Sequence, residues 1–216
     1  MTIACLHTAE SNIAVYEAAA KAFGLPDGML RHHVRADLLL AAEKVGRLTD
    51  EISAETAALL WHLAEDADAV VLNCSTLGPA ASKVAAGAGA PIIRADAMLA
   101  EQAACRGGKV IVLCTVETTI APTTALFEAA AKATGAEIEV RLVPGAWTHF
   151  RAGNLSAYLT SIADAVKAAS GEDAITIAFA QASMTDAVHL LPENCPQPMT
   201  GPAAALAAAI AKIMGS

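Results

Sequence analysis

Short runs of consecutive apolar residues alternate with longer alanine-rich segments along the whole chain. The runs predict strands and the longer segments predict helices, because strands buried on both faces are short and continuously apolar. The expected strands cover residues 2–6, 30–34, 69–72, 91–93, 109–114, 136–143 and 174–179. The expected helices cover residues 12–23, 53–67 with Ser53 as N-cap, 79–86, 95–104, 122–134, 155–170 and 201–214. This alternation is typical of an α/β fold with parallel sheets covered by helices on both faces.

The pattern starts again in the second half of the chain. The segment Leu6–Ser11 aligns with Leu113–Thr118 at an offset of 107, and YEAAAKAFG at Tyr16–Gly24 aligns with FEAAAKATG at Phe127–Gly135. Chance similarity between alanine-rich helices is the alternative, but the strand-end segment favours a duplication. We therefore expect two related halves, residues 1–107 and 108–216, divided at Gly107-Gly108, with the closing helix over 202–216 packing across.

Composition and charge narrow the classes of protein. The chain is 55% hydrophobic and 17% charged, which excludes a disordered protein. Its net charge is −8 and it has no basic stripe, which argues against nucleic acid as a partner. The most apolar stretch, residues 203–214, is too short and too alanine-rich to predict a membrane span.

Cysteine usage and the missing cofactor motifs point to a cytoplasmic protein without a bound cofactor. The five cysteines are odd in number and form no CxxC, and the first residues show no secretory signal. The adjacent His32 and His33 are a weak metal pair because neighbouring residues rarely face one point, so we expect no metal. No GxGxxG follows the first strand, so we expect no nucleotide cofactor.

The expected chemistry lies where strands end. In open parallel α/β sheets, ligands bind outside the carboxyl ends of the strands, which places Thr8 and Cys74 at a cleft between the halves. Cys74 precedes a predicted helix that begins at Pro79, and the helix N-terminus is expected to lower its thiol pKa toward neutrality. The N–H groups and hydroxyls of Ser75 and Thr76 are placed to hold a carboxylate. The alternative is that Cys74 is a small buried apolar residue.

The duplicated α/β halves, the Cys74-Ser75-Thr76 loop and a hydroxyl-rich loop opening each half resemble the aspartate/glutamate/hydantoin racemase superfamily, which includes arylmalonate decarboxylase and maleate isomerase. The resemblance covers the whole chain and implies two Rossmann-like or flavodoxin-like halves of about four parallel strands each. It also implies a cofactor-independent enzyme in which two cysteines exchange protons on opposite faces of the α-carbon of a small carboxylate.

The resemblance assigns roles to residues of this sequence. Cys74 matches the first-half cysteine, and Gln181 stands where the second-half cysteine is expected, at an offset of 107. An amide binds a carboxylate or an enediolate but does not protonate carbon, so the resemblance implies a one-thiol member. The residues expected to bind substrate are Thr8, Ser75, Thr76, Thr115, Thr118, Thr119 and Ser183.

Three further residues and several reactions stay open. His7 and His149 are candidates for a second base, and Arg35 for a clamp on a second carboxylate, with an ordinary surface ion pair as its alternative. The favoured hypothesis is an enzyme that catalyses racemisation or isomerisation. The alternatives are a decarboxylase or lyase that protonates one face of the carbon, a cysteine hydrolase, and a non-catalytic carboxylate-binding protein. The resemblance implies a homodimer.

Overall fold

The computed structural model describes residues 1–84, 87–171 and 176–215, and they form two compact units. The first unit is Met1–Met98 with Pro202–Ser216, and the second is Leu99–Gly201. The chain therefore passes between units twice, each time within the helix that follows the fourth strand of a half. The expected division at residue 107 was based on the sequence repeat, whereas these two units are defined by contacts within the structure. The division at residue 107 therefore stays a prediction.

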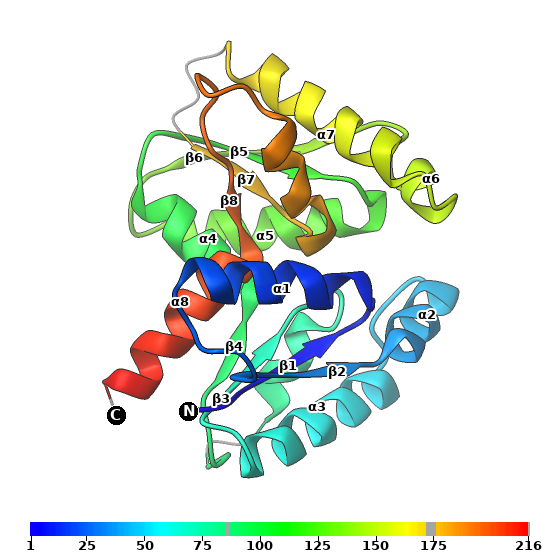
Figure 1. The fold of residues 1–216 in the computed structure, drawn as a ribbon. Coiled ribbons are helices and arrows are strands. Elements are labelled where there is room, and N and C mark those ends of the chain that lie inside the picture. The colour runs from blue at the N-terminus through cyan, green and yellow to red at the C-terminus, as the bar shows by residue number, and fades with distance from the viewer. Residues whose placement is uncertain (85–86, 172–175, 216) are drawn as a thin grey trace. The chain divides into compact units, whose positions relative to one another are not determined.

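The first unit contains a parallel sheet in the order β2-β1-β3-β4 (Figure 1). Its elements are β1 (Ile3–His7), α1 (Ser11–Ala22), β2 (Leu30–Val34), α2 (Ala36–Val45), α3 (Asp50–Glu65), β3 (Ala69–Leu72), the 3₁₀ helix η1 (Gly78–Lys83), β4 (Ile92–Arg94), the first part of α4 (Ala95–Cys105), and α8 (Gly201–Met214) from Pro202 onward. Helices α1 and α3 lie on opposite faces of this sheet (Figure 1).

Alternation along the strands decides which helix each residue meets. Ala4, Leu6, Val70 and Leu72 pack in one core cluster with the apolar face of α3. Successive side chains of a strand point to opposite faces, so Cys5 and His7 project to the other face. There the His7 ring lies 4.9 Å from that of Tyr16 in α1.

The second unit repeats this topology with the strand order β6-β5-β7-β8. Its elements are the rest of α4, β5 (Lys109–Cys114), the 3₁₀ helix η2 (Glu117–Thr119), α5 (Ile120–Ala131), β6 (Glu137–Leu142), α6 (Ala146–Arg151), α7 (Leu155–Ala169), β7 (Thr176–Phe179), the 3₁₀ helix η3 (Ala182–Leu190) and β8 (Met199–Thr200). The first residues of β6, β7 and β8 lie 137 − 30, 176 − 69 and 199 − 92 residues after those of β2, β3 and β4, which is 107 in each case. The offset read from the sequence is therefore the spacing of these three strand pairs, and β5 begins 109 − 3 = 106 residues after β1.

The expected α/β class and the two parallel sheets are confirmed, and most element boundaries agree with the sequence within two residues. The helix expected over 79–86 is instead the shorter 3₁₀ helix η1, with residues 85–86 outside the described ranges. Residues 174 and 175 of the expected strand over 174–179 also lie outside them. The apolar pattern did not predict α2, α6, η2, η3 or β8, which are short or irregular.

The expected cap of the third helix is wrong. Helix α3 begins at Asp50, and the hydroxyl of Thr49 accepts a hydrogen bond from the N–H of Ile52 at 3.3 Å. Ser53, the predicted cap, lies one turn inside the helix and is buried. Asp50 and Glu51 also lie in the first turn, where carboxylates favour the positive end of the helix dipole. The helix therefore starts one turn earlier than its apolar pattern suggests.

No helix among the residues that the structure describes has both the length and the apolar character that crossing a bilayer requires.

The cap at Thr49 gives a stability prediction. Thr49→Ala removes the acceptor for the Ile52 N–H and should lower the free energy of unfolding by about 1 kcal/mol. Urea denaturation followed by circular dichroism measures the change. Thr49→Ser keeps the hydroxyl and should stay close to the native stability. Equal losses in both variants would show that the hydroxyl does not cap α3.

Candidate active site

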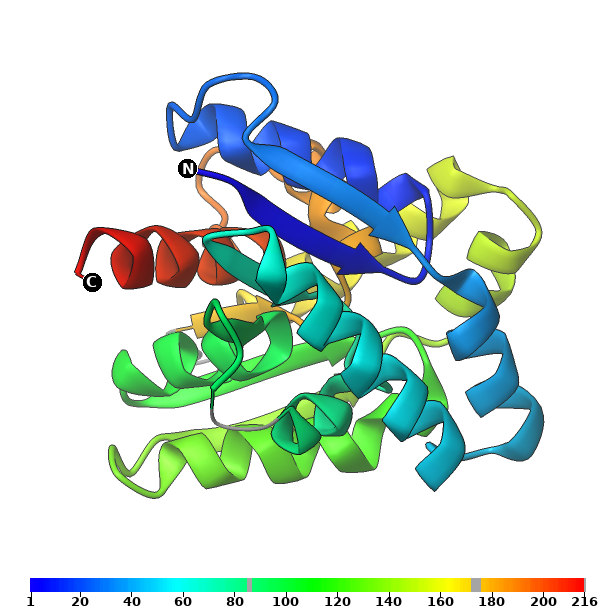
Figure 2. The same cartoon turned by 90° about the horizontal axis from the view of Figure 1, so that it is seen from below.

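The carboxyl ends of β1 and β3 meet at the centre of the first sheet. The strands pair in parallel, with Leu6 opposite Leu72, so the residues that follow them leave the sheet together. Figure 2 shows β1 and its other neighbour, β2, running side by side in the same direction. The chain turns from β1 toward α1 on one side and from β3 toward η1 on the other. This is the switch point of a doubly wound sheet, where ligands bind in open α/β folds. Thr8 and Cys74 stand at this point.

Cys74 is partly buried and packs against the core cluster beneath α3. The backbone N–H groups of Leu77 and Thr76 and the hydroxyl of Thr8 act on its thiol and lower the thiol pKa. The structure thus brings together Cys74 and two of the residues assigned to substrate binding. Ser75 lies between Cys74 and Thr76 in the same loop and is partly exposed.

The electrostatics of Cys74 differ from the expectation. Burial raises the pKa of the Cys74 thiol above its ordinary value of 9.0, and the carboxylate of Asp96 adds to the increase. The N–H groups of Leu77 and Thr76 and the Thr8 hydroxyl lower the pKa but do not reverse the shift. The expected decrease rested on a helix starting at Pro79, and the six-residue 3₁₀ helix η1 stands there instead. Loss of solvent therefore outweighs the local N–H dipoles.

Arg94 and Asp96 form an ion pair beside the Cys74 loop. Two nitrogens of Arg94 donate to the Asp96 carboxylate at 3.0 and 2.7 Å, and the Ala97 N–H donates to the same carboxylate at 2.9 Å. Gly78 permits this arrangement, because a Cβ at that position would lie 2.6 Å from a nitrogen of Arg94. The close approach needs a residue without a side chain.

His7 is fully buried at the end of β1, and both of its ring nitrogens have partners. Nδ1 lies 3.2 Å from the side-chain nitrogen of Asn73, and Nε2 lies 2.9 Å from Nδ1 of His32. Burial and the neighbouring His32 and His33 lower the pKa of His7 to about 4. His7 is therefore neutral at physiological pH and is held in a hydrogen-bonded chain.

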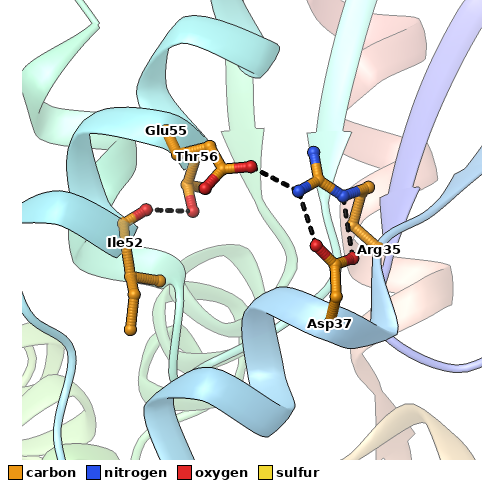
Figure 3. Close-up of polar contacts among 5 residues, drawn as sticks. All are labelled: Arg35, Asp37, Ile52, Glu55 and Thr56. Atoms are coloured by element: carbon orange, nitrogen blue, oxygen red, sulfur yellow. Dashed lines mark hydrogen bonds and ion pairs between the residues drawn. The ribbon is translucent and has the colours of Figure 1, made fainter.

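Arg35 follows β2, and two carboxylates of the chain hold its guanidinium (Figure 3). It donates to Asp37 at 2.8 and 2.6 Å and also pairs with Glu55 of α3. On the same helix, the Thr56 hydroxyl donates to the Ile52 carbonyl at 2.7 Å. The alternative reading of Arg35 as a surface ion pair matches these contacts, and a substrate carboxylate would compete with Asp37 and Glu55.

Gln181 occupies the matching position in the second unit, directly beyond β7. Its side-chain oxygen accepts hydrogen bonds from the N–H of Thr115 at 2.9 Å and from the Thr115 hydroxyl at 3.2 Å. Its side-chain nitrogen donates to the hydroxyl of Thr119 at 3.1 Å. The amide is therefore fixed in orientation between the loops that follow β5 and β7.

The hydroxyl network continues from Thr115 to Ser183. Tyr158 of α7 has its hydroxyl 3.4 Å from that of Thr115 and 2.8 Å from that of Ser183. Three of the four second-half residues expected to bind substrate thus belong to one network with Gln181, namely Thr115, Thr119 and Ser183. Thr118 is exposed in η2, and His149 lies in the last turn of α6.

Cys114 and Tyr158 lie in the same region, and the sequence did not indicate either of them. Cys114 is the buried last residue of β5. Burial raises the pKa of its thiol, and the side chains of Thr123, Thr119 and Gln181 oppose the increase. The repeat pairs Cys114 with His7, so both strands end on a polar buried side chain. This pairing could have indicated Cys114 from the sequence. No neighbouring residue in the sequence indicates a role for Tyr158.

Comparison with known proteins agrees with the fold. The family model for Asp/Glu/hydantoin racemase matches residues 7–210. The chain therefore belongs to the Asp/Glu/hydantoin racemase family. No match was found among curated proteins.

Solved racemase structures share this fold. Aspartate racemase from Picrophilus torridus superposes with a TM-score of 0.74 at 9% identity, over 99% of this chain and 95% of that chain. Glutamate racemase RacE1 from Bacillus anthracis gives 0.64 at 16% identity, over 99% and 82%. Allantoin racemase from Pseudomonas fluorescens gives 0.63 at 15% identity, over 99% and 91%.

The raised pKa of Cys74 predicts slow alkylation at neutral pH. The rate of reaction with iodoacetamide, followed by mass spectrometry of the Cys74 peptide, should still be rising at pH 9.0, the ordinary thiol value. Thr8→Val removes a hydrogen bond that stabilises the thiolate and should move the pH profile further upward. The exposed Cys105 serves as the internal reference. A Cys74 profile that levels off near pH 7 would contradict the electrostatic description.

Proposed function

We propose that the protein is a cofactor-independent enzyme of the racemase or isomerase type, acting at the α-carbon of a small carboxylate with Cys74 as its single acid/base thiol. One observation carries the proposal. The Cys74 sulfur stands at the switch point of the first sheet, where two backbone N–H groups and the Thr8 hydroxyl lower the pKa of its thiol. Cys74 is partly exposed there, whereas Cys114, at the end of β5, is fully buried.

These donors suit a sulfur that changes its charge during turnover. When the thiolate takes the α-proton of a bound carboxylate, the carbon becomes an enediolate and the sulfur becomes a neutral thiol. The reverse transfer returns the proton to carbon and restores the thiolate. The N–H groups of Thr76 and Leu77 and the Thr8 hydroxyl stabilise the charged form. Ser75 supplies a further hydroxyl for the carboxylate.

We further propose that Gln181 and its hydroxyl network bind a carboxylate. The amide N–H, held by contacts with Thr115 and Thr119, suits donation to a carboxylate or to the developing enediolate. An amide holds no proton that it can pass to carbon at neutral pH. Racemisation would then need Cys74 to act with another group, for which His149 and His7 remain candidates.

A one-face reaction is the second candidate, and the pKa of Cys74 favours it. A thiol whose pKa is raised is mostly protonated at neutral pH. It is therefore ready to deliver a proton to a carbanion that decarboxylation or elimination has produced. Gln181 would stabilise such an intermediate without protonating it.

Replacing Cys74 tests both candidates. Cys74→Ala should lower kcat/KM by about 10²–10⁴-fold, because the proton-transfer group is lost. Turnover should be followed with aspartate, glutamate, allantoin and substituted malonates, which cover racemisation and decarboxylation. Cys105→Ala removes an exposed thiol and is the matched control. Substrate binding without turnover in the native protein, or full activity in Cys74→Ala, would contradict the proposal.

Reaction in D₂O separates the two candidates. A racemase exchanges the α-hydrogen of the recovered substrate for deuterium, whereas a decarboxylase or lyase labels only its product. Proton magnetic resonance of both pools gives the result. Loss of the Gln181 amide in Gln181→Leu should reduce turnover by either route.

The pH profile gives a further prediction from the sign of the Cys74 shift. If the thiolate abstracts the proton, kcat/KM should rise with pH through and beyond pH 9.0, because the reactive form appears only above the raised pKa. If the thiol delivers the proton, activity should be present at neutral pH and fall as pH rises through that pKa. An activity that rises and levels off below pH 8 would contradict both assignments of Cys74.

A further inference from the structure

A cluster of metal-ligating side chains lies on the α1 face of the first sheet. Cys5 and His7 are two residues apart on β1, so their side chains project from the same face. His32 of β2 is the register partner of Cys5 in the parallel ladder, which brings its side chain to that face as well. The ligand atoms of the three residues all lie within 4.8 Å of one another.

Both histidines have a partner on the ring nitrogen away from the cluster. Nε2 of His32 lies 2.9 Å from Oε1 of Glu17 in α1, and Nδ1 of His7 lies 3.2 Å from the side-chain amide of Asn73. Metal-bound histidines commonly use their second nitrogen in this way, because the contact fixes the tautomer and the ring orientation. The other two nitrogens, Nε2 of His7 and Nδ1 of His32, face each other at 2.9 Å.

The contact between the two rings holds one proton. Glu17 accepts from His32 Nε2, so Nδ1 of His32 has a lone pair and takes the hydrogen bond from Nε2 of His7. A cation between the rings can replace that proton, provided that His7 carries its hydrogen on Nδ1. Turning the Asn73 amide presents its oxygen to that hydrogen. The sulfur of Cys5 then supplies the third ligand.

We propose that Cys5, His7 and His32 form a three-ligand site for a zinc-class transition-metal cation. One thiolate and two imidazoles are a donor set that Zn²⁺ prefers, and hard cations such as Mg²⁺ do not. Binding of Zn²⁺ forms the Zn–S bond, releases the thiol proton of Cys5 to solvent and shifts the His7 proton from Nε2 to Nδ1. Water supplies the fourth ligand.

Distances and access agree with this assignment. Zinc–ligand bonds of about 2.0–2.3 Å in a tetrahedron separate the ligand atoms by roughly 3.3–3.8 Å. The 2.9 Å between the two rings therefore has to open by less than about 1 Å, and the remaining pairs of ligand atoms, which lie within 4.8 Å, have to close by at most roughly 1.5 Å. Cys5 and His7 are fully buried, while the side chains of His32 and Glu17 are 12% and 46% exposed. The ion would enter past these two residues.

The adjacent histidines provide a matched pair of variants. His32 and His33 follow each other on β2, so their side chains point to opposite faces, and only His32 belongs to the cluster. After chelator treatment, the native chain should bind one Zn²⁺ and should bind Co²⁺ with a thiolate-to-cobalt charge-transfer band. His32→Gln should weaken Zn²⁺ binding by at least tenfold, and His33→Gln should bind as the native chain does.

Further variants separate this site from adventitious binding. Cys5→Ser should lose the charge-transfer band, whereas Cys105→Ser, which alters an exposed thiol, should keep it. Glu17→Ala should weaken Zn²⁺ binding by about 10–100-fold through the orientation of His32. Thermal unfolding with and without Zn²⁺ gives a second measurement, and Zn²⁺ should raise the Tm of the native chain but not that of Cys5→Ser.

Two results would overturn the proposal. Folded native protein that binds no Zn²⁺ or Co²⁺ would show that the cluster is a hydrogen-bonded chain and nothing more. Equal binding by the native chain and His32→Gln, with both folded by circular dichroism, would place the ion elsewhere. Neither result bears on Cys74, so the proposed function is tested separately.

Discussion

The parallel pairing of β1 with β3 is the constraint on which the rest of the first unit depends. Two adjacent parallel strands whose following helices pack on opposite faces leave an opening at their shared carboxyl end. Their register places Thr8 beside Cys74, although the two residues are far apart in the sequence. The same pairing of β5 with β7 brings Thr115 to Gln181 in the second unit. Each hydroxyl–partner contact follows from the sheet rather than from a local motif.

The two switch points differ in what they offer to a substrate. The first presents an ionisable sulfur whose charged form receives hydrogen bonds from surrounding donors. The second presents an amide already engaged by threonine hydroxyls and backbone, with a buried cysteine beneath it. The two sheets therefore share one strand order but end in different side chains. An amide does not exchange a proton with carbon as a thiol does.

The hydrogen-bonded histidines connect the strand ends to the interior. His7 joins Asn73, the residue before Cys74, to His32 and through it to Glu17 on α1. Burial keeps His7 neutral, so this chain adds orientation rather than charge beside the thiol. A change in the position of His7 would reach the Cys74 loop through the side chain of Asn73.

The sequence alone determined the strands, their parallel arrangement and the residues at their carboxyl ends. Continuous apolar runs and a 107-residue repeat are local and countable, and they located Cys74 and Gln181 before any coordinates. The cap at Thr49 was missed because the apolar pattern begins a turn after the helix does. Only the tertiary structure decided the direction of the Cys74 pKa shift, since desolvation depends on the segments that cover a group. Only the tertiary structure showed that Cys5 and His7 lie close to His32, and that Tyr158 lies close to Ser183. These contacts join segments that are distant in the sequence, and packing sets the distances between them.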